Sequence, residues 1–394
     1  MNFIKSTKII ALCVALSVVG CKKKDSGSTG PSASINSVRQ DRTTTSSTFH
    51  FVVSLSSAAA KPVSIHYTTV AGTAVANTDF IPATGTLTIG ANQSQAAVDI
   101  TVTGDSLRRD DQTFFVQLDN AQNCTLETDK GTGTIVNKDL LYFPVPATGY
   151  TTPTTYPGYT LAWSDEFDGS AINTATWGFE LGNNNGWGNA ELEYYTDRTQ
   201  NAFVSAGNLI IEARSESFGG KNYTSARMIT KNKKVFKYGR IDMRAKMPKG
   251  KGIWPALWML GNNIDAVGWP ACGEMDILEL LGQEPNKIYG TMHWGNTVLS
   301  HASKGTSYTL SSGSFDQQFH VYSLIWKQDD IRVLIDDQEY LHVTSVDVQG
   351  SNYPFNSDFF FIFNIAVGGN WPGSPDGTTV LPQRMVVDYV RVFQ

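Results

Sequence analysis

Three acidic residues, Glu274, Asp276 and Glu279, lie within an otherwise apolar segment, "GEMDILELLG" at residues 273–282. Because burying an unpaired charge costs several kcal/mol, carboxylates usually persist in such a segment when they are paired, bound to a metal ion or used in a reaction. The spacing of these acids is therefore the first indication of what chemistry the chain performs.

The spacing of the three acids fits neither an α-helix nor a regular β-strand. On a helix, Asp276 and Glu279 share a face while Glu274 points away from them. On a strand, alternation aligns Glu274 with Asp276 but turns Glu279 to the opposite face. A β-bulge at Ile277–Leu278 returns Glu279 to the face of the other two, and bulges are common beside active sites. We therefore predict a bulged strand that presents three acids to one cleft.

Two carboxyl groups that face a substrate are what glycoside hydrolysis requires. One attacks the sugar or activates a water molecule, and the other protonates the leaving oxygen. Asp276, between the two glutamates, would oppose ionisation of its neighbours and keep one acid protonated near neutral pH. Two other interpretations stay open at this point. One is a calcium or magnesium site, although these ions favour loop oxygens; the other is a ladder of salt bridges to neighbouring strands.

Aromatic residues concentrate around the acidic segment, as they do in clefts that bind sugars. The C–H faces of sugar rings pack on indoles, and nearby polar groups bind the hydroxyls. The aromatic and polar candidates are Trp187, Asn189, Glu191, Tyr194, Tyr195, Trp254, Trp258, Trp269, His293 and Trp294. Their concentration around one acidic motif favours a glycan-binding cleft.

The N-terminal residues indicate export. Residues 1–20 carry Lys5, Lys8 and an apolar run too short to span a membrane, which is typical of a secretory signal. The sequence "VVGC" resembles the lipobox of bacterial lipoproteins, which implies cleavage before Cys21 and lipidation of its thiol. The alternative is an N-terminal anchor helix that is never cleaved. With residues 21–32 as a flexible polar tether, we expect a lipid anchor on the bacterial outer membrane or cell surface.

Two β-domains are expected after the tether. Residues 33–139 alternate apolar and polar side chains between turns, the pattern of a small β-sandwich. The stretch "VSIHYTTVAGTAVANTDF" and the later "QTFFVQL" resemble the Calx-β domain, which implies an immunoglobulin-like sandwich. Residues 140–158, rich in Pro, Thr and Gly, are predicted to be a linker. Residues 159–394 lack a helical period and predict a large all-β sandwich.

The composition limits the classes of partner. Of 394 residues, 41% are hydrophobic and 17% are charged, so the chain can bury a sizeable core. The net charge of −5 argues against nucleic acid as a partner. We expect a monomer that meets the membrane only through its N-terminal lipid.

Residues 161–394 resemble glycoside hydrolase family 16, and specifically its laminarinase-type endo-β-1,3-glucanases. The resemblance is carried by "LAWSDEFDGS", "GWGNAELEYYT", "YGRIDMRAKMPKGKGIWPALWML", "GEMDILELLG", "GTMHWG" and "NIAVGGNWPG". It implies a concanavalin-like β-jelly-roll of two curved antiparallel sheets with a concave substrate cleft. It also implies endo-acting hydrolysis of β-1,3-glucan with retention, by double displacement, and no cofactor for catalysis.

The same resemblance implies a role for each acid in turn. Glu274 corresponds to the nucleophile, Glu279 to the general acid/base and Asp276 to the acid that assists them. His293 corresponds to a histidine close to the acid/base. These roles rest on the family motif and not on the spacing alone.

Further positions correspond to binding residues of the family. Those on the sugar-binding side are Asn189, Arg227, Trp258 and Trp269. A buried ion pair is the alternative role for Arg227. Many members also carry a structural calcium ion on the convex side, and its ligands would be Glu166, the Gly207 carbonyl and Asp388.

Other functions share this chemistry or this fold. Within the family, the substrate could instead be mixed-linkage glucan, agar or carrageenan. The E-x-D-x-x-E spacing argues against the lichenase type, which typically has one residue fewer between the last two acids. A transglycosylase would use the same retaining chemistry. A glucan-binding protein without catalysis is a further alternative, against which the presence of all three acids argues.

Overall fold

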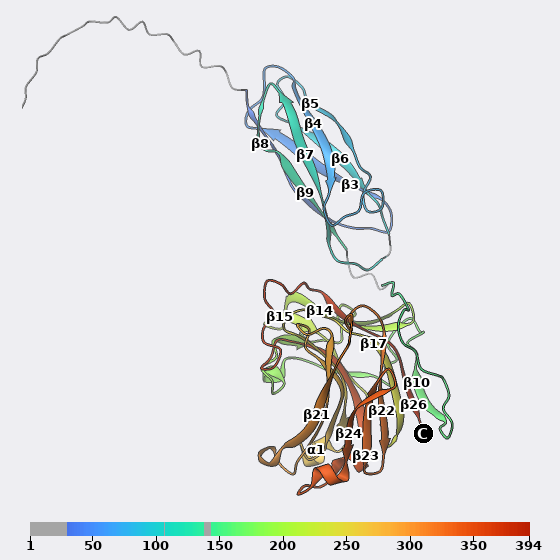
Figure 1. The fold of residues 1–394 in the computed structure, drawn as a ribbon. Coiled ribbons are helices and arrows are strands. Elements are labelled where there is room, and N and C mark those ends of the chain that lie inside the picture. Colours follow the sequence, from blue (N-terminus) through green and yellow to red (C-terminus); the bar gives the residue numbers. More distant parts are fainter. Residues whose placement is uncertain (1–29, 106, 138–142) are drawn as a thin grey trace, which may run out of the picture. The chain divides into compact units, whose positions relative to one another are not determined.

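The structure, a computed structural model, describes residues 30–105, 107–137 and 143–394 (Figure 1). The predicted signal peptide, Cys21 and most of the predicted tether lie outside the described residues. The chain divides into two compact units. Within the described ranges, no helix is long and apolar enough to cross a membrane.

The first unit is a β-sandwich of two sheets. One sheet has the order β6-β3-β1-β8 and the other the order β2-β9-β7-β4-β5. The strands are β1 (Ser32–Ile35), β2 (Val38–Asp41), β3 (Ser47–Leu55), β4 (Val63–Ala71), β5 (Thr84–Ile89), β6 (Gln95–Val102), β7 (Gln112–Gln122), β8 (Thr125–Thr128) and β9 (Lys130–Val136). The predicted alternation holds along β3, where Phe49, Phe51 and Val53 are buried and the residues between them are not.

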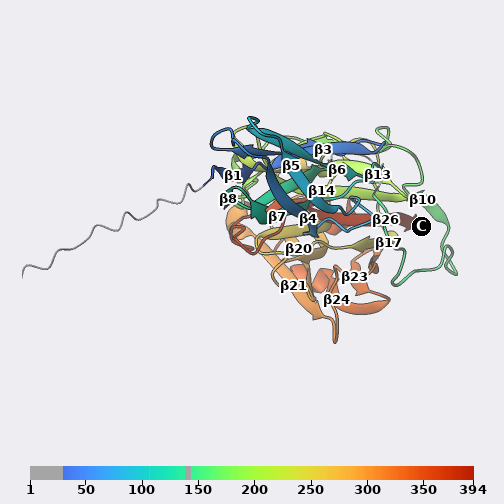
Figure 2. The same ribbon diagram turned by 90° about the horizontal axis from the view of Figure 1, so that it is seen from above.

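The second unit contains two large sheets, of ten and seven strands. The ten-stranded sheet runs β12-β15-β14-β26-β17-β22-β23-β24, with β10 paired to β26 and β13 to β14. Its strands are β10 (Leu161–Asp165), β12 (Glu193–Tyr195), β13 (Ala202–Ser205), β14 (Asn208–Phe218), β15 (Lys221–Ser225), β17 (Gly239–Lys246), β22 (His320–Lys327), β23 (Asp330–Ile335), β24 (Gln338–Thr344) and β26 (Gln383–Phe393). Strands β23 and β24 lie side by side in both views (Figure 1, Figure 2).

The seven-stranded sheet has the order β11-β16-β25-β18-β19-β20-β21. Its strands are β11 (Gly178–Glu180), β16 (Arg227–Ile229), β18 (Ile253–Gly261), β19 (Glu274–Leu280), β20 (Lys287–Trp294), β21 (Ala302–Thr309) and β25 (Phe359–Val367). The helical elements of the described ranges are short: α1 (Ile264–Val267), η1 (Asn184–Gly186), η2 (Val298–Ser300), η3 (Ser345–Val348) and η4 (Pro354–Asn356). This architecture confirms the predicted all-β class.

Strand alternation divides the seven-stranded sheet into a core face and an open face. Along β25, Phe361, Phe363 and Ile365 join the apolar core of the unit. Asn364 and Ala366, between and beside them, line a cleft on the other face. Every residue of β25, "FFFIFNIAV", is buried, including those that line the cleft. The run is accordingly apolar except for Asn364. The sheet therefore carries core on one side and the cleft on the other.

The segment predicted as a linker is partly held against the second unit. Residues 143–158 form no strand, as their Pro and Thr content predicts. However, the Arg244 guanidinium donates to the Tyr150 carbonyl at 2.6 Å, and the Tyr156 hydroxyl donates to Asp242 at 2.7 Å. Hydrogen bonds with buried residues of β17 therefore fix this segment although it has no apolar period.

Candidate active site

The three acids lie on β19, and the strand is bulged where the sequence predicts it. On the β18 side, Leu278 pairs with Leu257 and Asp276 with Trp258, so Ile277 is an extra residue. The register with β20 shifts between the same two acids, Asp276 and Glu279. The insertion turns Glu279 back to the face of Asp276, as a bulge does.

The bulge separates the acids from the apolar residues of the same strand. Met275, Ile277 and Leu278 are fully buried in the core between the sheets. Glu274, Asp276 and Glu279 all line the cleft. The same division holds on the neighbouring β18, where every second residue faces the cleft opposite the acids. The apolar run and the acidic motif therefore serve different faces of one strand.

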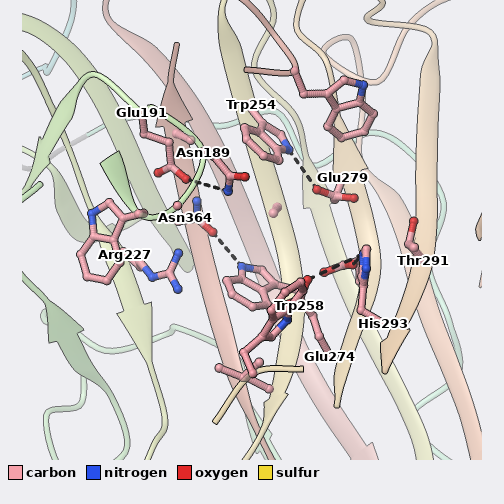
Figure 3. A pocket seen from close by; sticks show the side chains of 18 of the residues that line it. Asn189, Glu191, Arg227, Trp254, Trp258, Glu274, Glu279, Thr291, His293 and Asn364 are labelled. Carbon is pink, nitrogen blue, oxygen red and sulfur yellow. Dashed lines mark hydrogen bonds and ion pairs between the residues drawn. The ribbon is translucent and has the colours of Figure 1, made fainter. Parts of the chain in front are cut away.

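The cleft has a volume of about 640 Å³ and is both aromatic and polar. Its tryptophans come from four separate parts of the chain, and Figure 3 shows Trp254 beside Glu279 and Trp258 beside Glu274. The aromatic and polar side chains that line it are Trp187, Asn189, Glu191, Arg227, Trp254, Trp258, Trp269, Glu274, Asp276, Glu279, Thr291, His293, His301, Asn364 and Trp371. Indoles beside carboxyl groups suit a sugar chain, which offers C–H faces and hydroxyls together.

Each of the two glutamates accepts a hydrogen bond from an indole. Nε1 of Trp269 donates to Oε2 of Glu274 at 3.0 Å, and Nε1 of Trp254 donates to Oε1 of Glu279 at 3.1 Å. Figure 3 shows Trp254 and Glu279 pointing toward one another across β18 and β19. The two tryptophans thus hold the carboxyl groups in place.

His293 lies on β20 against the other two members of the cluster. Its Nε2 atom is 3.2 Å from Oδ2 of Asp276 and 3.8 Å from Oε1 of Glu274. Oδ2 of Asp276 is buried and, among the residues that the structure describes, has no partner that meets hydrogen-bond geometry. The register places His293 directly opposite Glu274, so the pairing of β19 with β20 creates this contact. A histidine "close to the acid/base", as the sequence predicts, is closest in the structure to the assisting acid.

Burial controls the protonation of the acids. Burial, followed by repulsion from Asp276, raises the pKa of Glu274 to about 8. Burial also raises the pKa of Asp276. For Glu279, burial and the charges of the other two acids raise the pKa well above its usual range. The proximity of His293 and the Trp269 hydrogen bond oppose the shift at Glu274. Glu279 is therefore the acid that keeps its proton, and Glu274 the acid that ionises more readily.

Arg227 combines both of the roles considered for it. Its Nε donates to the Glu180 carboxylate, which makes it a largely buried ion-pair partner. Its guanidinium also lies 4.7 Å from the ring centroid of Trp187 and 4.8 Å from that of Trp258, and it lines the cleft. The ion pair fixes a charged, planar group between two indoles at one end of the cleft.

A chain of hydrogen bonds orients the floor of the cleft at the same end. Nε1 of Trp258 donates to Oδ1 of Asn364 at 2.8 Å, and Nδ2 of Asn364 donates to the Tyr195 hydroxyl at 3.0 Å. The Tyr195 hydroxyl donates to Glu191, which also accepts from Asn189 at 3.3 Å. The predicted sugar-binding residues Asn189 and Trp258 are thus brought together by residues between them.

Several cleft residues were not predicted from the sequence. Asn364 lies inside an apolar strand, and Trp371 follows that strand in the loop before β26. Trp371 packs edge-on against Trp254 at 5.5 Å. Thr291 and His301 also line the cleft. The signals that could have identified them are a single polar residue in a buried strand and the conspicuous "GGNWPG" loop.

Strand pairing brings the backbones of the predicted calcium ligands close together, but their carboxylates do not converge on one site. β10 pairs with the end of β26 and β14 with its middle, which brings residues after Asp165 and before Asn208 toward Asp388. However, both carboxylate oxygens of Glu166 accept from Arg391, at 2.9 and 2.7 Å. Asp388 accepts from Arg244 at 2.7 Å. The backbone fits a shared site, and the carboxylates are directed to arginines instead.

The acidic motif has two other interpretations, a calcium or magnesium site and a ladder of salt bridges. In the described part of the chain, one group of three candidate metal ligands has donor atoms within 4.8 Å of one another, namely Glu274, Asp276 and His293. No Lys or Arg of the described residues forms an ion pair with the three acids, so a ladder of salt bridges is not what the strand carries. The acids face the cleft and not a facing row of cations.

Comparison with known proteins gives the same result. A model of glycosyl hydrolases family 16 matches residues 189–391, and a model of the Calx-beta domain matches residues 35–139. The chain is 39% identical over 260 residues to glucan endo-1,3-beta-glucosidase A1 of Niallia circulans, covering 60% of this chain and 38% of that protein. It is 41% identical over 249 residues to a beta-glucanase of Rhodothermus marinus, covering 60% of this chain and 86% of that protein.

A solved structure shares the fold of the second unit. The catalytic domain of an endo-1,3-beta-glucanase (laminarinase) from Thermotoga petrophila is 49% identical and superposes with a TM-score of 0.57. The match covers 60% of this chain and 98% of that domain. The predicted jelly-roll is confirmed, as is the Calx-β resemblance of the first unit. The chain therefore belongs to glycosyl hydrolase family 16.

Proposed function

We propose that this protein is an endo-acting hydrolase of β-1,3-glucan that retains the anomeric configuration. The observation that carries the proposal is the placement of Glu274 and Glu279 on one face of β19, each held by an indole N–H in a single cleft. Two carboxyl groups so placed supply a nucleophile and a proton donor. The matched relatives, named for β-glucan or β-1,3-glucan cleavage, support the substrate.

In the first step, Glu274 attacks the anomeric carbon of the bound sugar while Glu279 donates its proton to the glycosidic oxygen. The bond between sugar and leaving chain breaks, and a glycosyl ester forms on Glu274. Glu279 begins the step protonated, because burial and two neighbouring acids raise its pKa. The proximity of His293 and the hydrogen bond from Trp269 favour the ionised state that Glu274 needs.

In the second step, the ionised Glu279 removes a proton from water as the water attacks the glycosyl ester. The sugar leaves Glu274, and both glutamates return to their starting states. Asp276 lies between the glutamates along the strand, and its buried charge raises the pKa of each. It therefore helps to retain a proton on the cluster whenever Glu279 must act as an acid.

The shape of the cleft supports cleavage within a chain. Indoles lie beside both glutamates: Trp269 donates to Glu274, and Trp254, against which Trp371 packs edge-on, donates to Glu279. Stacking surfaces on both sides bind sugar units before and after the scissile bond. A chain that passes through the cleft can be cut at interior linkages.

The substrate is tested by a panel of laminarin, lichenan, agarose and carrageenan, with the sizes of the products followed over time. We expect laminarin fragments of mixed intermediate length early in the reaction and shorter ones later, with the new reducing ends initially in the β-anomeric form by NMR. Faster release from lichenan or a galactan would assign a different substrate, and α-anomeric first products would exclude retention. Products that grow longer at high laminarin concentration would indicate transglycosylation.

We also propose that the protein is anchored by a lipid on Cys21, which the "VVGC" motif supports. In bacteria grown with a labelled fatty acid, the expressed protein should carry the label and fractionate with membranes. Cys21→Ser should lose the label and leave the membrane fraction, whereas Cys124→Ser should keep both. Label that persists in Cys21→Ser would exclude this residue as the site.

For calcium, we propose a structural role at Glu166, Gly207 and Asp388, supported by the strand register that brings their backbones together. Binding requires Glu166 and Asp388 to leave their arginines. Calcium at about 100 times its Kd would add about 2.7 kcal/mol to the free energy of unfolding, which corresponds to roughly 5–10 °C in Tm. Scanning calorimetry with calcium and with chelator measures the difference, which Asp388→Asn should abolish. Equal Tm values for the wild type in both buffers would end the proposal.

A further inference from the structure

Tyr340 of the ten-stranded sheet contacts the bulge of β19, which belongs to the other sheet. Tyr340 lies on β24, at one end of its sheet, and its ring packs against the apolar core. Its hydroxyl donates to the carbonyl oxygen of Ile277 at 2.8 Å. Ile277 is the extra residue of the bulge, and neither the register with β18 nor that with β20 gives it a partner. A side chain from one sheet therefore binds the backbone of the other at the residue that strand pairing leaves out.

A glycine on β20 leaves the space that the Tyr340 hydroxyl occupies. Gly290 is the single residue of β20 opposite the two bulge residues Ile277 and Leu278, and it is buried. A Cβ atom on Gly290 would lie 2.7 Å from Oη of Tyr340 and 3.1 Å from Cε2 and Cζ of its ring. Nonbonded carbon atoms prefer about 3.5–4.0 Å, so any larger residue at 290 would displace the hydroxyl. Gly290 and Tyr340 are thus fitted to each other around the bulge.

The Tyr340 hydroxyl supplies a proton that the bulge needs. Ile277 is fully buried, and a buried backbone carbonyl requires a hydrogen-bond donor. Burial, followed by the charges of Glu279 and Asp276, raises the pKa of Tyr340 well above its usual range. The hydroxyl therefore stays protonated and remains a donor.

The hydrogen bond lies two residues before Glu279 and after Glu274. The extra residue is what returns Glu279 to the cleft face, so the backbone at Ile277 sets where the Glu279 carboxyl group lies. Glu274 precedes the bulge and pairs directly with residues of both neighbouring strands. Movement of the bulge should therefore displace Glu279 and leave Glu274 in place.

We propose that Tyr340 is a positioning residue that fixes the bulge of β19 and so holds Glu279 where it can transfer a proton to the glycosidic oxygen. The inference rests on the proposed hydrolytic function of the two glutamates. Tyr340 is not among the described residues that line the cleft. It acts through the backbone of Ile277 and does not touch the sugar.

Three variants separate the hydrogen bond from the packing of the ring. Tyr340→Phe keeps the ring and removes the hydroxyl. Gly290→Ala keeps the hydroxyl but places a methyl group where it lies. Tyr308→Phe is the matched control, because Tyr308 lies on the neighbouring β21, packs near Tyr340 and donates its hydroxyl to the Gln338 side chain at 3.1 Å.

NMR can observe the Ile277 carbonyl by itself. Isoleucine is followed by leucine once in the chain, at Ile277 and Leu278. Protein labelled with 13C-carbonyl isoleucine and 15N-leucine therefore gives one carbonyl–amide correlation, whose carbonyl shift responds to hydrogen bonding at the oxygen. We expect this signal to move upfield in Tyr340→Phe and in Gly290→Ala and to stay in place in Tyr308→Phe. An unchanged signal in Tyr340→Phe would overturn the proposal.

Two substrates distinguish a displaced Glu279 from a general loss of activity. Laminarin needs the Glu279 proton, so its kcat should fall about 10- to 100-fold in Tyr340→Phe, with KM unchanged. A laminarin oligosaccharide with a dinitrophenyl leaving group needs no proton. Its initial burst of dinitrophenolate reports the attack by Glu274 and should keep the wild-type rate. Tyr308→Phe should keep the wild-type rates on both substrates.

The remaining variants test whether one contact is responsible. Gly290→Ala should show the same selective loss, and the double variant Gly290→Ala/Tyr340→Phe should lose no more than Tyr340→Phe, because both changes break the same contact. We expect Tm to fall by about 2–4 °C in Tyr340→Phe, so assays at room temperature compare folded proteins.

Two results would leave Tyr340 as a packing residue and overturn the proposal. One is an equal fall in the rates on laminarin and on the dinitrophenyl substrate in Tyr340→Phe. The other is an additive loss in the double variant. A wild type that cleaves neither substrate would instead refute the proposed function, while the Ile277 carbonyl signal would still decide whether Tyr340 holds the bulge.

Discussion

We expect the Glu274→Ser variant to lose laminarin hydrolysis while it still binds the glucan. The serine hydroxyl is too short to reach the anomeric carbon and has no base beside it, so no glycosyl ester forms. We expect kcat to fall by at least about 10⁴-fold, in line with the removal of other enzymatic nucleophiles. Reducing-sugar release measures the loss, and titration with a laminarin oligosaccharide measures the binding that remains.

The control for this variant is Glu339→Ser, at an exposed position on β24 in the other sheet. It should retain wild-type activity and an unchanged Tm. Activity of Glu274→Ser within tenfold of the wild type would show that another group attacks the sugar. Loss of both activity and binding in Glu274→Ser, with a lowered Tm, would indicate a damaged fold, in which case Glu274→Gln replaces it.

Replacing Glu279 with glutamine affects the two chemical steps differently. The amide cannot protonate a leaving sugar, so laminarin hydrolysis should fall by about 10²–10⁴-fold. A substrate with a dinitrophenyl leaving group needs no proton and should still form the glycosyl ester on Glu274. Because the amide cannot then activate water, the ester should accumulate, and mass spectrometry of the intact protein should detect it.

Azide distinguishes this explanation from a general loss of activity. Azide is a nucleophile that needs no base, so it should release the trapped sugar from Glu279→Gln as a β-glycosyl azide. The wild type should show no comparable acceleration. Glu284→Gln, in the turn that follows β19 and partly exposed, serves as the matched control with wild-type rates. If azide does not accelerate turnover of the dinitrophenyl substrate, Glu279 is not the base of the second step.

The position of the acids could be predicted because their spacing fits neither an α-helix nor a regular β-strand. A strand with an extra residue between Asp276 and Glu279 was the single local geometry that placed three acids together, and the register of β19 with both neighbours contains it. The alternation of apolar and polar residues along β3 likewise follows from the face that this strand buries.

The remaining cleft residues depend on pairings that lie far apart in the sequence. Asn364 looks like a polar defect in an apolar strand until the pairing of β25 with β18 places it below Trp258. His301 looks like an ordinary loop residue until β21 pairs with β20 and brings it to His293. Short-range patterns carry no information about which strands become neighbours, so these contacts could not be predicted.

The segment predicted as a linker also forms contacts that its sequence could not predict. Its composition predicts a linker, but composition does not report hydrogen bonds to distant partners. The carbonyl of Tyr150 and the hydroxyl of Tyr156 are bound by side chains of β17. A segment without an apolar period was therefore still fixed, because buried polar groups on the sheet required partners.

The bulge also determines which changes in length β19 can tolerate. Ile277 has no partner on β18, while the residues on either side of it pair in regular order. Deleting that one residue would leave Glu274, Asp276 and Glu279 on the same face and every later side chain on its present side, because alternation would simply become regular. Inserting one residue would also allow regular alternation with Glu279 on the cleft face, but it would move Glu279 two residues along β18, from opposite Ala256 to opposite Trp254 and about 7 Å further from Asp276. Shortening by one is therefore an accessible evolutionary step for this strand, and lengthening by one is not.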